Sequence, residues 1–548
     1  MPAEEVIDVS GLYVSPGFID SHLHVEGLHL LPSAYAPAFA AHGTTTIITD
    51  LHEIANAGGI TAMFWYLDLL ESVPVDVLVM APSCVPSCAF EQGFGKIGLQ
   101  ELKKLRNDQR VIGLGEVMDV PGVVRRNKSM LEKIALFARR PVDGHAPMVS
   151  GDMLRAYRAA GIGSDHETTS PEEGLEKLSN GMHLFLRHGS VSKDLERLLP
   201  LIKPRYLSRL SLCTDDLSAQ DLFEKGHLDR MIRLLVKRGV PLVDTVRLVT
   251  VNPARYFNLK DRGLLARGKK ADIVVFEDPG GPEGPKKMRV RMTIKDGRVV
   301  YRPGKRTTAP RALKPAPESR MKIAQFSIDD LRQKAPGHVY GHTITAIGVR
   351  EGTIITDHRR LEARIDDDGY LQADTEHDSI YAYVFDRYRG RKAYGFGFVQ
   401  GFSLRGGAIG TTYAHDSHNL VIVGDNIMDI LLVLNALREV NGGMALARSG
   451  ELLERIPMPF YGIISGLAAK EFLRKEKRMR KILRSMGVRL TNPFFQMSFL
   501  SLPVIPSLRL TTRGLFDTTR MRYIERQGPG AGVQGPERPD RTVNRSRH

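Results

Sequence analysis

The sequence predicts an α/β protein built on a (β/α)8 barrel of the TIM type, with a small β-sandwich element and a C-terminal α/β domain. Two observations predict the barrel. Short apolar, strand-like runs alternate with helical patterns between position 16 and about position 260, as consecutive βα units do. Eight such runs occur there, and a stretch of roughly 245 residues is typical of one barrel. The runs cover residues 17–20, 45–50, 75–81, 111–116, 141–145, 161–166, 183–189 and 210–215.

Helical patterns separate these runs. Residues 57–72, 128–140 and 170–181 have helix-like sequences. Ser170 followed by Pro171 is typical of a helix start, because the serine side chain accepts from a free N–H group and proline has no N–H to satisfy. The sequence therefore predicts helices that connect parallel strands.

The chain has 548 residues, which is too long for one hydrophobic core. Strand-like alternation around a Lys-Asp-Gly turn at 295–297 predicts a small β element, to which the first residues can add a strand. Farther on, an apolar strand at 419–424 and a helix at 426–440 indicate a second globular unit. The predicted units are a composite β domain (1–15 and 261–305), the barrel (16–260), a linker (306–323), the C-terminal domain (324–520) and a disordered basic tail (521–548).

Composition and charge exclude several classes of protein. No apolar run reaches the roughly 20 residues that span a bilayer, and the first residues do not form a secretory signal. Three cysteines cannot form a disulfide framework, so we expect a cytoplasmic protein. The net charge of +15 lies almost wholly in residues 302–323, 470–484 and 520–548. Such segments are commonly solvated, so nucleic acid is not the expected partner.

Imidazoles and carboxylates stand at or just after the ends of five of the predicted strands. Because the carboxyl ends of parallel barrel strands surround one mouth, these side chains are expected to meet there. Nitrogen and oxygen ligands of this kind suit borderline-hard divalent cations. The pattern therefore predicts a metal-dependent hydrolase. The residues are His22, His24, Glu116, His145, His166 and Asp215.

The sequence around these residues carries a family resemblance. The motifs are PGFIDSHLHVE, HGTTTIITDLHEIANAGG, GLGEVMDVPGV, DGHAP, SDHETTSPEEGLEKLSNGM, RHGSVSKDLERLLP, CTDD and VNPARYF in the barrel, and FGFVQGF, GAIGTTYAHDSHNLVIVG and MSFLSLPVIPSLRLTTRGLFD in the second unit. Together they resemble adenine deaminases of the amidohydrolase superfamily. The resemblance extends from Pro16 to about Asp517.

The resemblance implies a centre of two divalent metal ions. His22, His24 and Asp215 would hold one ion, and His145 and His166 would hold the other. Glu116 would bridge them, where many relatives in the superfamily use a carboxylated lysine. The family implies iron or manganese, with zinc as an alternative, and a homo-oligomer. The implied reaction is the hydrolysis of adenine, a small-molecule purine, to hypoxanthine and ammonia.

Further roles follow from that chemistry. Asp215 is expected to act as general base and then as general acid. His52 is a candidate proton shuttle or ring-polarising group, or else a strand-end histidine bonded to a loop carbonyl. Glu167 would contact a purine ring N–H or orient His166. Arg187 is expected to form an ion pair or anchor a loop, with substrate contact as the other interpretation.

Other interpretations stay open from the sequence. His415, Asp416 and His418 form a second cluster, for which we expect loop structure or a contribution to the substrate pocket rather than a third metal site. Gly27 and Leu28, where the family commonly has two serines, favour a related amidohydrolase that acts on a substituted purine or another cyclic amidine. Leu217 and Ser218 also depart from the family pattern. A non-catalytic, nucleic-acid-associated protein is the alternative of a different class.

Overall fold

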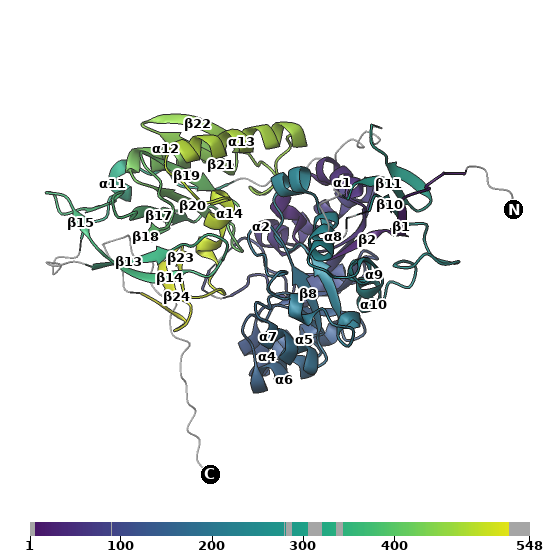
Figure 1. The fold of residues 1–548 in the computed structure, drawn as a ribbon. Helices are drawn as coiled ribbons and strands as arrows, with labels where there is room; N and C mark the ends of the chain where they lie inside the picture. The colour runs from purple at the N-terminus through teal and green to yellow at the C-terminus, as the bar shows by residue number, and fades with distance from the viewer. Residues whose placement is uncertain are drawn as a thin grey trace, which may run out of the picture.

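The computed structural model describes residues 6–304 and 321–524, except positions 89, 92, 279, 281–287 and 336–342. Figure 1 shows two units side by side, an N-terminal unit in purple to teal and a C-terminal unit in green to yellow. None of the helices described is both long enough and apolar enough to span a membrane.

The N-terminal unit is the predicted barrel. Strands β2 to β6 form one parallel sheet in sequence order, and β7 to β9 form a second. Gly163 N donates to Val142 O (2.8 Å) between the two sheets, and a parallel bridge from Leu23 to Asp215 closes the ring. Each predicted run overlaps one strand, which confirms the fold class. The strands are β2 (Phe18–Leu23), β3 (Thr44–Asp50), β4 (Asp76–Ala81), β5 (Val111–Val117), β6 (Val142–Gly144), β7 (Ser164–Asp165), β8 (His183–Arg187) and β9 (Leu210–Cys213).

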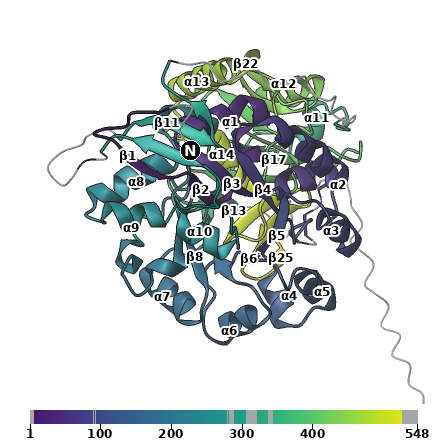
Figure 2. The ribbon, with the colours of Figure 1, turned by 90° about the vertical axis from the view of Figure 1, so that its right-hand side faces the viewer.

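Helices surround these strands (Figure 2). The N-cap predicted for the helix after β7 is confirmed, since Ser170 Oγ accepts from Glu173 N (3.2 Å). Apolar side chains of β2, β3 and β4 pack inside the ring with those of β8, β9 and α10. The helices of this unit are α1 (Pro32–Ala41), α2 (His52–Leu69), α3 (Leu99–Leu105), α4 (Val120–Val124), α5 (Lys128–Leu136), α6 (Gly151–Ala159), α7 (Pro171–Ser179), α8 (Leu228–Lys237), α9 (Leu242–Arg247) and α10 (Val251–Tyr256).

The small β element is, in the residues described, one antiparallel sheet of four strands in the order β1-β10-β11-β12. Its N-terminal strand β1 pairs with β10. Asp296 and Gly297 both have positive φ (49° and 76°), as a tight two-residue hairpin turn requires. The strands are β1 (Tyr13–Pro16), β10 (Ile273–Phe276), β11 (Val290–Lys295) and β12 (Arg298–Tyr301).

The C-terminal unit is built on a mixed sheet in the order β14-β13-β18-β17-β20-β19-β21-β22, with α12 packed on it. The predicted strand and helix correspond to β20 and α12, and Asn426 Oδ1 caps α12 by accepting from Asp429 N (2.8 Å). The strands are β13 (Thr343–Gly348), β14 (Asp357–Glu362), β15 (Arg364–Ile365), β16 (Leu371–Gln372), β17 (Ile380–Phe385), β18 (Tyr394–Gln400), β19 (Gly407–Thr411), β20 (Leu420–Gly424), β21 (Gly443–Arg448), β22 (Glu451–Pro457), β23 (Leu508–Thr511), β24 (Gly514–Asp517) and β25 (Arg522–Tyr523). The helices are α11 (Ile328–Leu331), α12 (Ile427–Glu439), α13 (Ala469–Ser485) and α14 (Pro493–Ser498).

Most of the predicted linker (306–323) and of the predicted disordered tail (521–548) lies outside the described residues. At their described ends the chain is part of the fold. Lys322 N donates to Arg387 O (2.8 Å), and β25 pairs with β24. Main-chain hydrogen bonds therefore extend into both segments, and residues 522–523 form a strand rather than a disordered tail.

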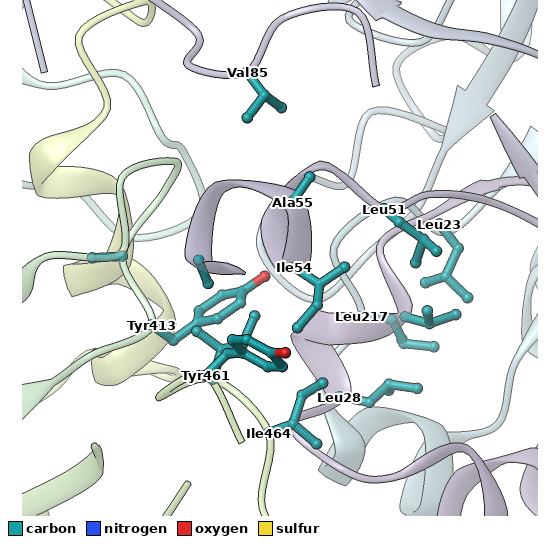
Figure 3. Packing of buried hydrophobic residues seen from close by; sticks show 14 of the residues in the cluster. Leu23, Leu28, Leu51, Ile54, Ala55, Val85, Leu217, Tyr413, Tyr461 and Ile464 are labelled. Atoms are coloured by element: carbon teal, nitrogen blue, oxygen red, sulfur yellow. The ribbon is translucent and has the colours of Figure 1, made fainter. Parts of the chain in front are cut away.

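One buried hydrophobic cluster contains residues of both units. Tyr413 and Ile464 of the C-terminal unit belong to the same buried cluster as Leu28 and Ile54 of the barrel, and Figure 3 shows them together. Ser465 N also donates to His29 O (2.8 Å). The C-terminal unit thus lies directly against the segments that follow β2 and β3, on the side where barrel sites form.

Candidate metal centre

The six predicted ligands converge at the mouth of the barrel. His22 lies in β2 and His24 directly follows it, while Glu116 lies in β5. His145, His166 and Asp215 follow β6, β7 and β9, so each parallel strand delivers its side chain to the same end of the barrel. All are buried except His145, whose side chain is 12% exposed.

His22, His24 and Asp215 form one half of the cluster. His24 Nε2 lies 3.2 Å from His22 Nε2 and 3.2 Å from Asp215 Oδ1. Glu116 Oε1 faces the same two imidazoles, at 3.2 Å from His22 Nε2 and 3.0 Å from His24 Nε2. Two imidazole nitrogens and two carboxylate oxygens therefore share one small space.

His145 and His166 form the other half. The second oxygen of Glu116, Oε2, lies 2.8 Å from His145 Nδ1 and 3.8 Å from His166 Nε2. Glu167 Oε1 is 3.4 Å from His166 Nε2. Glu116 thus stands between two histidine pairs and presents one oxygen to each, which is the arrangement of a carboxylate that bridges two cations.

The donor set fits divalent metal ions. Two nitrogens that bind one ion at about 2.1 Å lie about 3.0–3.4 Å apart for angles between octahedral and tetrahedral, and the separation of His22 from His24 is within that range. Glu116 Oε1 is buried and accepts no hydrogen bond. A divalent cation bound there would satisfy the two facing imidazole nitrogens and this carboxylate oxygen together.

A buried ion pair holds the loops after β6 and β7. Lys177 Nζ lies 2.9 Å from Asp165 Oδ2 and donates to Ala146 O (2.8 Å), and Asp165 Oδ1 accepts from Ala146 N (2.9 Å). Although burial by itself raises it, Lys177 holds the pKa of Asp165 well below its usual range. Since Ala146 follows His145 and Asp165 precedes His166, this pair positions both ligands.

The remaining predicted site residues surround the cluster. His52 begins α2, with Nδ1 3.7 Å from Glu116 Oε1. Arg187 Nη1 donates to Asp215 Oδ2 (2.9 Å) and to Glu167 Oε1, and Nη2 and Nε both donate to Asp194 Oδ2 (3.0 and 3.3 Å). These contacts are those of an ion-pair anchor for two carboxylates at the mouth.

Sequence reasoning missed Glu53. This fully buried carboxylate contacts His415 and His418 from the C-terminal unit and lies 3.5 Å from His52 Nε2. The run around His415 was the available signal, but nothing local to it indicates a partner more than 350 positions earlier. One side-chain nitrogen or oxygen of each of His52, Glu53 and Asp416 also lies within 4.8 Å of the others, close enough for the three to hold one metal ion.

Comparison with known proteins identifies the family. Residues 13–300 match the amidohydrolase family, and residues 353–522 match the adenine deaminase C-terminal domain. An adenine deaminase of Methylobacterium nodulans is 40% identical over 520 residues, which is 95% of this chain and 90% of that protein. The chain belongs to the adenine deaminase family of amidohydrolases.

Other members of the adenine deaminase family are similarly close. Adenine deaminase 2 of Carboxydothermus hydrogenoformans is 37% identical over 94% of this chain and 89% of its own length, and the Brucella anthropi protein is 36% identical over 94% and 90%. A crystal structure of an adenine deaminase matches 53% of this chain and 87% of its own, with a TM-score of 0.39 and 17% identity.

The departures from the adenine deaminase pattern lie together in space. A side chain at Gly27 would begin 3.2 Å from Tyr413 Oη and 3.8 Å from Leu217 O. Leu28 and Leu217 are both buried in the core that the two units share (Figure 3). These positions face the C-terminal unit.

Proposed function

We propose that this chain hydrolyses adenine to hypoxanthine and ammonia with two divalent metal ions. One observation carries the proposal: Glu116 stands between two buried histidine pairs at a barrel mouth, in a chain 34–40% identical to adenine deaminases over nearly its full length. The balance of the reaction is simple. The oxygen of water bonds to C6, the C6–N6 bond breaks, and the two protons of water end on the leaving nitrogen and on ring N1.

The proposed ligand assignment follows the two halves of the cluster. His22, His24 and Asp215 hold one ion, His145 and His166 hold the other, and Glu116 contacts both. When bound, such ions lower the pKa of a coordinated water so that it can attack at neutral pH. We propose iron or manganese as the metal, with zinc as the alternative, because nitrogen and carboxylate donors accept all three.

Asp215 is the proposed proton carrier. Its Oδ1 faces His24, and Arg187 donates to its Oδ2 (2.9 Å), so the carboxylate is held at a fixed angle in the mouth. In that position it takes the proton from the attacking oxygen and delivers it to the leaving nitrogen. The same arginine holds Glu167, which we propose contacts a ring N–H of the purine.

His52 is the proposed second proton-transfer group. Its ring lies beside His24, with a centroid separation of 4.6 Å, and Nδ1 points to the Glu116 side of the mouth. An imidazole there can donate to or accept from the purine ring while Asp215 serves the leaving nitrogen.

Two further proposals concern the state of the protein. The family resemblance supports a homo-oligomer, and three free thiols, those of Cys84, Cys88 and Cys213, support a cytoplasmic location. Size-exclusion chromatography with light scattering tests the first, and fractionation of the source cells tests the second.

The function is tested with protein loaded with iron or with manganese. We expect about two metal ions per chain, a loss of adenine absorbance and one ammonia per adenine. Protein that holds two ions and leaves adenine unchanged would contradict the proposal. A panel of N6-substituted adenines and other cyclic amidines shows whether adenine is the preferred ring.

A further inference from the structure

The loop between β19 and β20 is unusual because it is both polar and buried. Residues 412–419 include His415, Asp416 and His418, which are 3%, 3% and 0% exposed. Connecting loops normally lie on the surface, where water satisfies their polar groups. This loop instead enters the space above the barrel mouth, so its polar groups must be satisfied by the protein.

Three side chains of the loop converge on one barrel carboxylate. His418 Nε2 lies 2.6 Å from Glu53 Oε2, His415 Nδ1 contacts Glu53 Oε1, and the Tyr413 hydroxyl donates to Oε1 (3.5 Å). We call Glu53, Tyr413, His415 and His418 the Glu53 clamp. Because Ala414 N donates to His418 Nδ1 (3.1 Å), the proton of that ring is on Nε2, where it faces Glu53.

Contacts around the clamp fix the position of the loop relative to the barrel. The ring of His415 stacks on Phe499, with centroids 4.4 Å apart, and His415 N donates to Ser498 O (2.9 Å). Tyr413 lies beside the first turns of α2, close to Ile54 (Figure 3). Although burial opposes it, the two histidines hold the pKa of Glu53 well below its usual range. Glu53 also raises the pKa of His415 against burial, whereas burial lowers the pKa of His418, so the charged pair of the clamp is Glu53 with His415.

Asp416 lies between the two clamp histidines in sequence and faces His52. Its Oδ1 is 4.0 Å from His52 Nε2, and the other ring nitrogen of His52 is 3.7 Å from Glu116 Oε1. Glu53 Oε1 also lies near His52 Nε2, at 3.5 Å. His52 therefore has Asp416 and Glu53 at one ring nitrogen and the central carboxylate of the metal cluster, Glu116, at the other. Catalytic contacts of this length commonly shorten when substrate binds.

We propose that Asp416 is a positioning residue that orients the His52 ring toward the metal centre, and that the Glu53 clamp holds Asp416 in place. This inference rests on the proposed function. The C-terminal unit then supplies part of the reaction machinery. A third metal ion at His52, Glu53 and Asp416 is the competing interpretation, and the metal content of the variants below distinguishes the two.

The first test compares Asp416→Asn and Asp416→Glu with the wild type. We expect kcat on adenine to fall about 10- to 100-fold in Asp416→Asn, with KM within about threefold and two metal ions retained. Asp416→Glu keeps the charge and is expected to recover part of the rate. Asp429→Asn is the control. Asp429 is a buried carboxylate of the same unit, and its oxygens accept from the backbone N–H groups of Ser449 and Gly450.

Three results would overturn the inference: an unchanged kcat in Asp416→Asn, an equal loss in both Asp416 variants, or a third metal equivalent that Asp416→Asn loses. A crystal structure of Asp416→Asn gives a readout that needs no turnover, and there an unmoved His52 ring would overturn it as well. A wild-type protein that binds two ions but leaves adenine unchanged would contradict the proposed function instead.

The second test measures the clamp by a double-mutant cycle on the unfolding equilibrium. We expect Glu53→Gln and His418→Gln each to lower the equilibrium constant for folding at least tenfold, and the double variant to lose much less than the product of the two. Both single variants are also expected to lower kcat as Asp416→Asn does. Independent effects on folding, or a normal kcat, would show that the clamp does not hold Asp416.

Discussion

Two buried clusters of the same residue types lie side by side in this molecule, and they differ in which atoms face one another. In the metal centre, imidazole nitrogens face one another, as His22 and His24 do at 3.2 Å, and the Glu116 carboxylate lies within 4 Å of five histidines. In the Glu53 clamp, each imidazole faces its own carboxylate oxygen. The first arrangement fits a cation between the facing nitrogens, whereas in the second each carboxylate oxygen has an imidazole nitrogen as its own partner.

The difference shows that residue type does not identify a metal site. Histidines and carboxylates near one another are equally consistent with ion pairs and with ligands. The deciding feature is which atoms point toward one another, because two nitrogen lone pairs repel and a nitrogen and a carboxylate oxygen can share a proton. The comparison leads to four predictions, from the largest expected effect to the smallest.

The largest effect is expected from Glu116→Gln. Loss of the shared negative charge should reduce the metal content and lower kcat/KM at least about 1,000-fold, since both ions lose a ligand. Metal analysis and the adenine assay measure this together. Glu101→Gln is the control, because Glu101 lies at the start of α3 and its Oε2 accepts from Gly98 N (2.9 Å). A Glu116→Gln protein that keeps two ions and a normal rate would contradict the role of Glu116 as a metal ligand, which distinguishes the metal centre from the clamp.

Asp215→Asn should separate chemistry from metal binding. We expect kcat to fall about 100- to 10,000-fold, because an amide cannot carry the proton, while His22, His24 and Glu116 retain the metal. Turnover and metal content of the same preparation provide the test. A near-normal rate would refute Asp215 as the proton carrier.

Chelation should act on one cluster only. If the ions are supplied at about 100 times their Kd, their removal lowers the free energy of unfolding by about 3 kcal/mol for each site. If the clamp holds no metal, as we propose, wild type and His418→Gln should lose the same amount. Chemical denaturation with and without chelator measures this, and a smaller loss in His418→Gln would indicate metal in the clamp.

The smallest effect concerns pH and the clamp. Although burial opposes it, Glu53 and Asp216 raise the pKa of His415 to about 9 from 6.5. A raised pKa stabilises the fold fully below pH 6.5, and this stabilisation is lost as the pH rises through 9. The stability gap between wild type and His415→Gln should thus shrink from pH 7 to pH 9, by at most about 3 kcal/mol. Denaturation series at these pH values measure it, and a constant gap would contradict a charged His415.

Much of the barrel could be predicted from local patterns. Runs such as 45–50 and 111–116 are apolar, short and bounded by turns, and they became β3 and β5. The N-cap at Ser170 was predictable because capping depends on a few adjacent residues. Strand ends can also be recognised in the sequence, so His22, Glu116 and His166 are expected at one mouth from the sequence alone.

The sequence by itself determined the fold class and the meeting of the six predicted ligands, because strand periodicity and strand ends are local properties of the chain. The resemblance of its motifs indicated the family. Only the tertiary structure decided which atoms face one another. It gave Glu116 one oxygen for each histidine pair, and it brought Glu53 to His415 and His418 across the two units. Such long-range pairing has no local signal, since it depends on how separately formed elements pack. Packing between the two units therefore decided which partners His415, Asp416 and His418 contact.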